Sequence, residues 1–123
     1  MLSHIVKIKT EVRDAAAVTA ACRRRQLPDP VFGRHRLYRG EVEGLAVQLR
    51  DWHYPAVCQL DTGEVQYDNF NGRWGDQREL DSFLQGYAVE KARIEARKRG
   101  HTVTEQALAD GSIKVTVQIG GVA

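Results

Sequence analysis

Two stretches near the start of the chain carry the first structural signals. Residues 3–10 (SHIVKIKT) alternate between the two faces of an extended chain, which is the period of a half-buried strand. Residues 15–22 (AAAVTAAC) favour a short helix, because Asp14 precedes them as an N-cap and the arginines at 23–25 suit the negative end of the helix dipole. The prolines at 28 and 30 then predict a loop.

The middle of the chain shows no helical period. Apolar residues gather in three short clusters, at 45–49, 56–60 and 65–67, with glycines between them. These clusters predict a meander of three strands. Asp61-Thr62-Gly63 is typical of a hairpin turn, since glycine readily adopts the positive φ that a tight turn requires.

The longest periodic segment runs from residue 76 to residue 100. Asp76 and Glu79 are spaced as in a capping box, and Gly100 follows a basic last turn, so the segment has both the start and the end of a helix. Apolar side chains recur between them every three or four residues, at Leu80, Phe83, Leu84, Tyr87, Ala88 and Ile94. One face of this helix is predicted to lie in the core.

The last part of the chain predicts a hairpin. Residues 102–107 and 113–119 flank Asp110-Gly111, and the second run alternates apolar and polar positions. The element order is then β-α-β-β-β-α-β-β. This order predicts an α+β fold, a two-layer sandwich with two helices packed on one face of a largely antiparallel sheet. Residues 1–123 are expected to form a single domain, because a chain of 123 residues is of ordinary domain size.

Composition and charge narrow the function only slightly. The hydrophobic fraction of 42% and charged fraction of 28% are typical of a globular domain, and a net charge of +2 does not by itself indicate nucleic-acid binding. Cys22 and Cys58 lie singly in apolar stretches, which favours reduced, packed thiols. The sequence has no apolar run of signal-peptide or membrane-span length, so we expect a cytoplasmic protein that does not enter the membrane.

Three segments together resemble a known family. They are SHIVKIKT at 3–10, YAVEKA and EAR within 87–97, and GHTVTEQ at 100–106 leading into DGSI at 110–113. The joint pattern resembles an uncharacterised family of short bacterial, phage and plastid proteins that includes the plastid and cyanobacterial hypothetical chloroplast reading frame thirty-five protein. The resemblance covers both ends of the chain and implies no catalytic residue. It implies an accessory or adaptor role, because relatives are often encoded near AAA+ ATPases.

Catalytic and metal chemistry finds little support in the sequence. The histidines are scattered, at His4, His35, His53 and His101, without a spacing that would place two metal ligands on one helical face or turn. The two cysteines lie in apolar surroundings that raise a thiol pKa and weaken it as a nucleophile. We therefore expect no metal and no cofactor, and an enzyme is the least favoured class.

Aromatic residues are concentrated at 67–76 (YDNFNGRWGD), just before the long helix, and again at 52–54. Aromatic and arginine side chains contribute most of the binding energy at interfaces and can also stack on exposed bases. The candidate interaction residues are Phe70, Arg73, Trp74, Trp52 and Tyr54. The alternative is that Phe70 and Trp74 pack the loop onto the sheet and the helix, as an apolar residue before a cap commonly does.

Both predicted helices end in basic residues. Together they would form a positive patch suited to phosphates if the two helix ends lay at one edge of the sheet. The candidate residues are Arg24, Arg25, Arg97, Lys98 and Arg99. The alternative is that each run complements its helix dipole and keeps the protein soluble.

Three classes of function follow from these observations. The sequence favours a small non-enzymatic binding or adaptor protein whose partner is another protein, with a AAA+ ATPase or a second copy of the chain as candidates. A nucleic-acid-binding protein that uses the basic helix ends is the alternative. A small-molecule enzyme is the third class.

Overall fold

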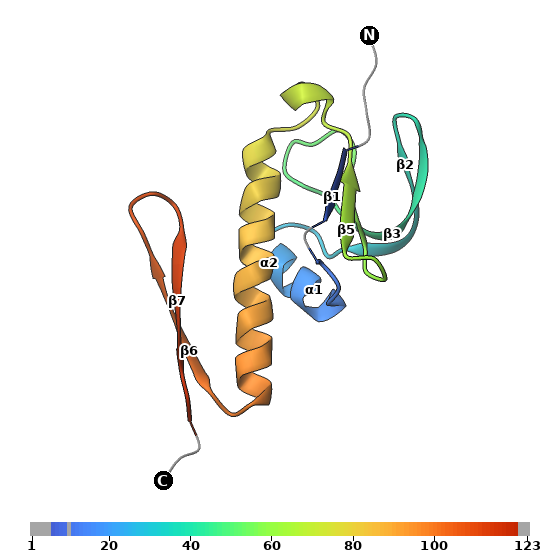
Figure 1. Cartoon of the computed structure of the whole chain (residues 1–123). Helices are drawn as coiled ribbons and strands as arrows, with labels where there is room; N and C mark the ends of the chain where they lie inside the picture. The colour runs from blue at the N-terminus through green and yellow to red at the C-terminus, as the bar shows by residue number, and fades with distance from the viewer. Residues whose placement is uncertain (1–5, 10, 121–123) are drawn as a thin grey trace.

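The computed structural model describes residues 6–9 and 11–120. These residues form a five-stranded sheet, two α-helices, a short 3₁₀ helix η1 (Phe70–Gly72) and a separate two-stranded sheet (Figure 1). The main sheet has the order β1-β5-β4-β3-β2, and every neighbouring pair is antiparallel. Its strands are β1 (Val6–Lys9), β2 (Val31–Leu37), β3 (Gly40–Val47), β4 (Ala56–Gln59) and β5 (Glu64–Tyr67).

The predicted α+β class is confirmed, and the described residues contain seven strands, one more than the six that the sequence predicted. Strand β2 follows the prolines at 28 and 30, where we expected a loop, and it pairs with β3 from Val31 to Leu37. It lies at the edge of the sheet and has one hydrogen-bonded neighbour. An edge strand tolerates polar and charged side chains, and β2 has no apolar run like those of the central strands. For this reason the sequence pattern did not predict it. The predicted strand at 3–10 is present as β1, and residues 3–5 and 10 lie outside the described residues.

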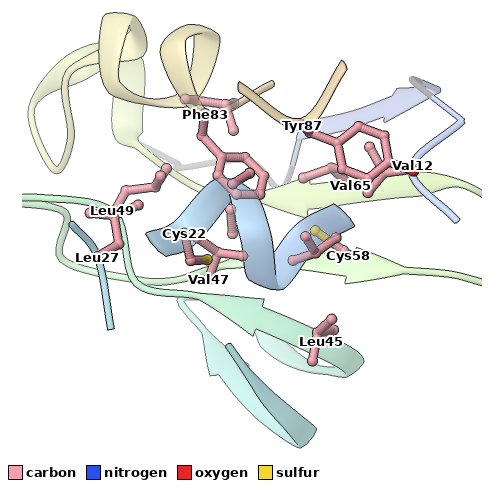
Figure 2. Packing of buried hydrophobic residues seen from close by; sticks show 14 of the residues in the cluster. Val12, Cys22, Leu27, Leu45, Val47, Leu49, Cys58, Val65, Phe83 and Tyr87 are labelled. Carbon is pink, nitrogen blue, oxygen red and sulfur yellow. The ribbon is translucent and has the colours of Figure 1, made fainter. Parts of the chain in front are cut away.

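Helices α1 (Ala15–Arg24) and α2 (Gln77–Lys98) pack against each other and cover one face of the main sheet (Figure 1). The core between the layers combines side chains of both helices with those of β3, β4 and β5, as Figure 2 shows for Cys22, Phe83 and Val47. Burying each large apolar side chain of this kind stabilises the fold by about 1.5–3 kcal/mol. No helix of the described residues is long and apolar enough to cross a membrane.

The helix ends follow the predicted capping residues, with one exception. The Asp14 carboxylate accepts two backbone hydrogen bonds at the start of α1, and the Asp76 carboxylate accepts one at the start of α2. Gly100 lies just after α2 with a φ of 76°, the left-handed conformation that commonly ends a helix. The exception is Glu79, which does not close the predicted capping box among the described hydrogen bonds but lies 3.3 Å from the Arg25 guanidinium of α1.

A smaller apolar cluster lies on the opposite face of the sheet. Side chains alternate along a strand, so Val42 and Ala46 of β3 lie on the face opposite Leu45 and Val47. The cluster is completed by Leu37 and Val57, with Tyr54 packed against it. This packing brings the β2–β3 hairpin close to the loop that precedes β4.

The predicted C-terminal hairpin is confirmed. Strands β6 (Thr102–Ala107) and β7 (Ile113–Gln118) pair only with each other among the described residues and lie beside α2 (Figure 1). Gly111 takes a φ of 90° in the connecting turn. The hairpin therefore forms a second sheet and does not extend the first.

Candidate interaction surface

Aromatic side chains from three separate segments meet around Trp74. Tyr38 follows β2, His53 and Tyr54 precede β4, and Phe70 precedes Trp74 in the segment before α2. The centroid of the Trp74 ring system lies 4.8 Å from that of Phe70, 5.2 Å from Tyr38, 5.6 Å from Tyr54 and 5.7 Å from His53. We call these five residues the aromatic surface.

The aromatic surface is both ordered and accessible. Tyr38 is 47% exposed and His53 is exposed, while Tyr54, Phe70 and Trp74 are half-buried. Aromatic pairs at these separations attract each other by about 0.5–1.5 kcal/mol beyond the effect of burial. The rings therefore hold one another in place while part of each still faces solvent.

Most of the predicted interaction residues belong to this surface or border it. The Arg73 guanidinium lies 5.1 Å from the centroid of the Phe70 ring, a cation–π geometry, and Arg73 is exposed. Trp52 is different because it is buried in the core and meets Tyr67 edge to face at 5.6 Å. The sequence did not single out Tyr38, which lies far along the chain from Trp74 and is recognised only from the fold.

The loops that carry the aromatic surface rest on a packed base. The His53 N–H donates to the Trp74 carbonyl at 2.7 Å, which joins the two loops through their backbones. Beneath them, the Trp52 indole N–H donates to the Asp76 carbonyl at 3.0 Å. Gly75 lies directly on the Trp52 ring, and a Cβ at this position would overlap the indole. Contacts within the protein therefore hold the two loops in place.

The backbone beneath Phe70 is strained. Phe70 and Asn71 have φ values of 47° and 53°, in the left-handed region that residues other than glycine rarely adopt. For phenylalanine this conformation costs on the order of 1–3 kcal/mol and persists only where its surroundings hold it, whereas asparagine adopts it more readily. Asp68 is fully buried here, and its Oδ1 accepts a hydrogen bond from the Phe70 N–H at 3.3 Å. The unfavourable backbone conformation therefore occurs at the residue whose ring contributes to the aromatic surface.

The basic residues predicted as a patch are spread along the length of α2. Arg24 contacts Glu90 and Glu105 at 2.6 and 2.7 Å, and Arg25 contacts Glu79 in the first turn of α2. The other three, Arg97, Lys98 and Arg99, are exposed at the opposite end of that helix. With a rise of 1.5 Å per residue, Glu79 beside Arg25 lies about 27 Å along α2 from Arg97, whereas Glu90 beside Arg24 lies only about 10 Å from it. The structure does not bring the five side chains into one patch.

The cysteines are unsuited to nucleophilic chemistry. Burial, and secondarily the charge of Asp29, raises the pKa of Cys22 to about 11, and burial raises the pKa of Cys58 to about 12. Both thiols therefore stay protonated at neutral pH, and the thiolate is the reactive form. Across residues 6–9 and 11–120, no group of three His, Cys, Asp or Glu side chains is arranged to hold a metal ion.

The fold and this surface together define an α+β domain that presents a preformed aromatic surface. The chain matches no protein-family model, no curated protein and no solved structure.

Proposed function

We propose that the protein is a non-enzymatic binding or adaptor domain that contacts a partner protein through the aromatic surface. The observation that carries the proposal is the position of Trp74, which touches four other rings and remains half-buried. Aromatic side chains of this kind dominate the binding energy of protein interfaces. A surface that is already ordered also loses little conformational entropy on binding, which strengthens the complex.

The chemistry around the aromatic surface narrows the partner. Arg73 extends from its border as an exposed cation stacked on Phe70, and arginine binds carboxylates through two parallel hydrogen bonds. We propose a partner segment with apolar or aromatic side chains beside an acidic residue. A AAA+ ATPase is the first candidate, since the family resemblance implies an accessory role next to such enzymes.

The test compares Trp74→Ala with Phe32→Ala. Phe32 is a matched control, because it is an aromatic side chain, 68% exposed, on β2 and outside the aromatic surface. The tagged chain is used to capture partners from an extract of its host, and the affinity of each purified partner is then measured by calorimetry. Trp74→Ala is expected to weaken binding at least tenfold, the scale of an interface hot spot, while Phe32→Ala changes it less than twofold.

A second variant keeps this test independent of folding. Arg73→Glu alters an exposed side chain and reverses the charge at the border of the surface, so it should weaken binding without lowering the melting temperature. Unchanged binding in both Trp74→Ala and Arg73→Glu would contradict the proposal. Equal loss in Phe32→Ala would also contradict it.

Nucleic-acid binding is the alternative function. The observation in its favour is the exposed basic run at the end of α2, Arg97, Lys98 and Arg99. The ion pairs of Arg24 and Arg25 with acidic side chains reduce the positive charge available elsewhere. Fluorescence anisotropy with labelled single and double strands tests this function, because phosphate contacts weaken steeply between about 50 and 200 mM salt. The absence of binding at low salt would exclude it.

A further inference from the structure

The β6–β7 hairpin is an incomplete sheet. Among the described residues it has only two strands, so each strand has one edge without a strand partner. On its apolar face, Val117 of β7 is 45% exposed, and Ile119, the residue after the end of β7, is 72% exposed. A two-stranded hairpin is marginally stable alone and is stabilised by further strands or by packing against a helix. Here α2 supplies the helix on one side, and the outer edge of β7 stays open to a further strand among the described residues.

The direction of the backbone groups at the open edge of β7 follows from the turn. The Leu108 N–H donates to the Ser112 carbonyl at 2.9 Å, so these two residues form a hydrogen-bonded pair. Such pairs alternate with non-hydrogen-bonded pairs along an antiparallel ladder. In the register of this hairpin, Ile113, Val115 and Val117 therefore direct their N–H and C=O groups toward the open edge.

The open edge of β7 is complementary to itself. A second copy can pair antiparallel with it about a two-fold axis at Thr116, where the outward backbone groups of the two strands face each other. Ile113 then lies opposite Ile119, and Val115 lies opposite Val117. The polar face places Thr116 opposite Thr116 and Lys114 opposite Gln118. Residues directly opposite interact, and this register contains no pair of like charges.

The edge of β6 is less suited to such pairing. Glu105 lies in the middle of β6, where it contacts Arg24 at 2.7 Å and Arg93 at 2.9 Å. These ion pairs fix β6 against the two helices. No side chain of β7 takes part in a described ion pair or side-chain hydrogen bond, so β7 is the less constrained edge of the hairpin.

We propose that the protein forms a symmetric homodimer in which the two β7 strands pair and join the two hairpins into one four-stranded sheet. The second copy satisfies the backbone groups of the open edge and covers the apolar side chains beside it. One strand per copy buries less than the roughly 1,200–2,000 Å² of a standard interface, so the dimer is expected to be reversible. This proposal is independent of the aromatic surface, and Trp74→Ala should leave the dimer intact.

The first test is a cysteine cross-link at the proposed axis. Thr116→Cys would place two thiols at a non-hydrogen-bonded pair, where opposite Cα atoms are about 4.5 Å apart, within the range that a disulfide spans. Lys114→Cys is the matched control, because it is exposed on the same face of the same strand. Its two copies would be separated by four strand positions, about 13 Å, which is too far for a disulfide. The native cysteines are buried and do not compete.

The expected result is a disulfide-linked dimer of Thr116→Cys under mild oxidation, at least tenfold more abundant than for Lys114→Cys. Sedimentation of the unmodified protein should show a dimer whose fraction rises with concentration. Equal cross-linking of the two variants, no cross-linking of either, or a monomer at every concentration would each overturn the proposal.

A charge exchange tests the register independently. Thr116→Glu and Thr116→Lys each place like charges opposite each other at the axis, so each variant alone should dimerise at least tenfold more weakly. An equimolar mixture should recover the dimer as a heterodimer, because the charges are then opposite. A mixture that behaves like the separate variants would contradict pairing at Thr116.

Discussion

Trp52 and Trp74 illustrate what single residues contribute to this structure. Both are tryptophans in short segments rich in aromatic residues, and both were predicted from the sequence to be interaction residues. Trp52 is buried against Tyr67 and beneath Gly75, whereas Trp74 is half-buried at the centre of the aromatic surface. The contact between Trp52 and Gly75 joins residues far apart along the chain and exists only in the folded protein.

Gly75→Ala is expected to destabilise the fold by about 1–3 kcal/mol, the usual cost of inserting a methyl group into a packed site. The added Cβ would overlap the Trp52 indole, and the loop that carries Trp74 would have to move. Urea unfolding measures the change. Gly86→Ala in α2 is the control, because its nearest contact is the flexible Arg24 side chain at 3.3 Å and alanine favours a helix over glycine by about 1 kcal/mol. An equal loss of stability in both variants would show that the Trp52 contact is not the cause.

Among the secondary-structure elements, those with local signals were predicted most completely. Asp14 and Asp76 start the helices and Gly100 follows the second, because capping involves residues within one turn of each other. Strand β2 was missed because an edge strand need not be apolar. The position of the β6–β7 hairpin beside α2 depends on ion pairs between residues far apart in sequence, chiefly those of Glu105.

The attachment of the hairpin should depend on pH. Hydrogen bonds from Arg24, with a smaller contribution from Arg93, lower the pKa of Glu105 below its ordinary value of 4.5 despite partial burial. A carboxyl group whose folded-state pKa is lowered stabilises the fold above its unfolded-state pKa, and this contribution is lost as the pH falls through the folded-state pKa. We therefore expect the hairpin to loosen below about pH 4.5.

Glu105→Gln should produce the same loosening at neutral pH. Hydrogen exchange followed by mass spectrometry is expected to show faster exchange of the amides in β6 and β7, with the strands β3, β4 and β5 unchanged. Glu41→Gln is the control, since Glu41 pairs with Arg34 at 3.8 Å on the main sheet and both side chains are exposed. Hairpin protection that is the same in Glu105→Gln and in the unmodified protein would contradict the anchoring role of Glu105.

For the whole molecule, one core between the helices and the main sheet encloses both cysteines. Cys22 belongs to α1 and Cys58 to β4, and both are fully buried in the same cluster (Figure 2). Neither thiol can meet a reagent in water unless the two layers separate. Their reactivity therefore reports on opening of the whole core.

A thiol reagent at about pH 8 should modify Cys22 and Cys58 only as the protein unfolds, because burial raises both pKa values well above the ordinary thiol range. Phe83→Ala removes a fully buried ring from the same core and should cost about 3–5 kcal/mol. Labelling of both cysteines should accelerate together in this variant, as measured by absorbance and mass spectrometry. Fast labelling of either cysteine in the unmodified protein would contradict the described core.

Short-range interactions explain which features could be read from the amino-acid order. Capping acids, helical periods and glycine turns act within a few residues, so the two helices, the central strands and the final hairpin were predicted with the α+β class. The edge strand β2, the burial of Trp52 and the separation of the basic helix ends depend on contacts between distant segments. The meeting of Tyr38, His53 and Trp74 depends on such contacts as well. The three rings meet because the β2–β3 hairpin packs against the loop before β4. This packing places residues side by side that are far apart along the chain.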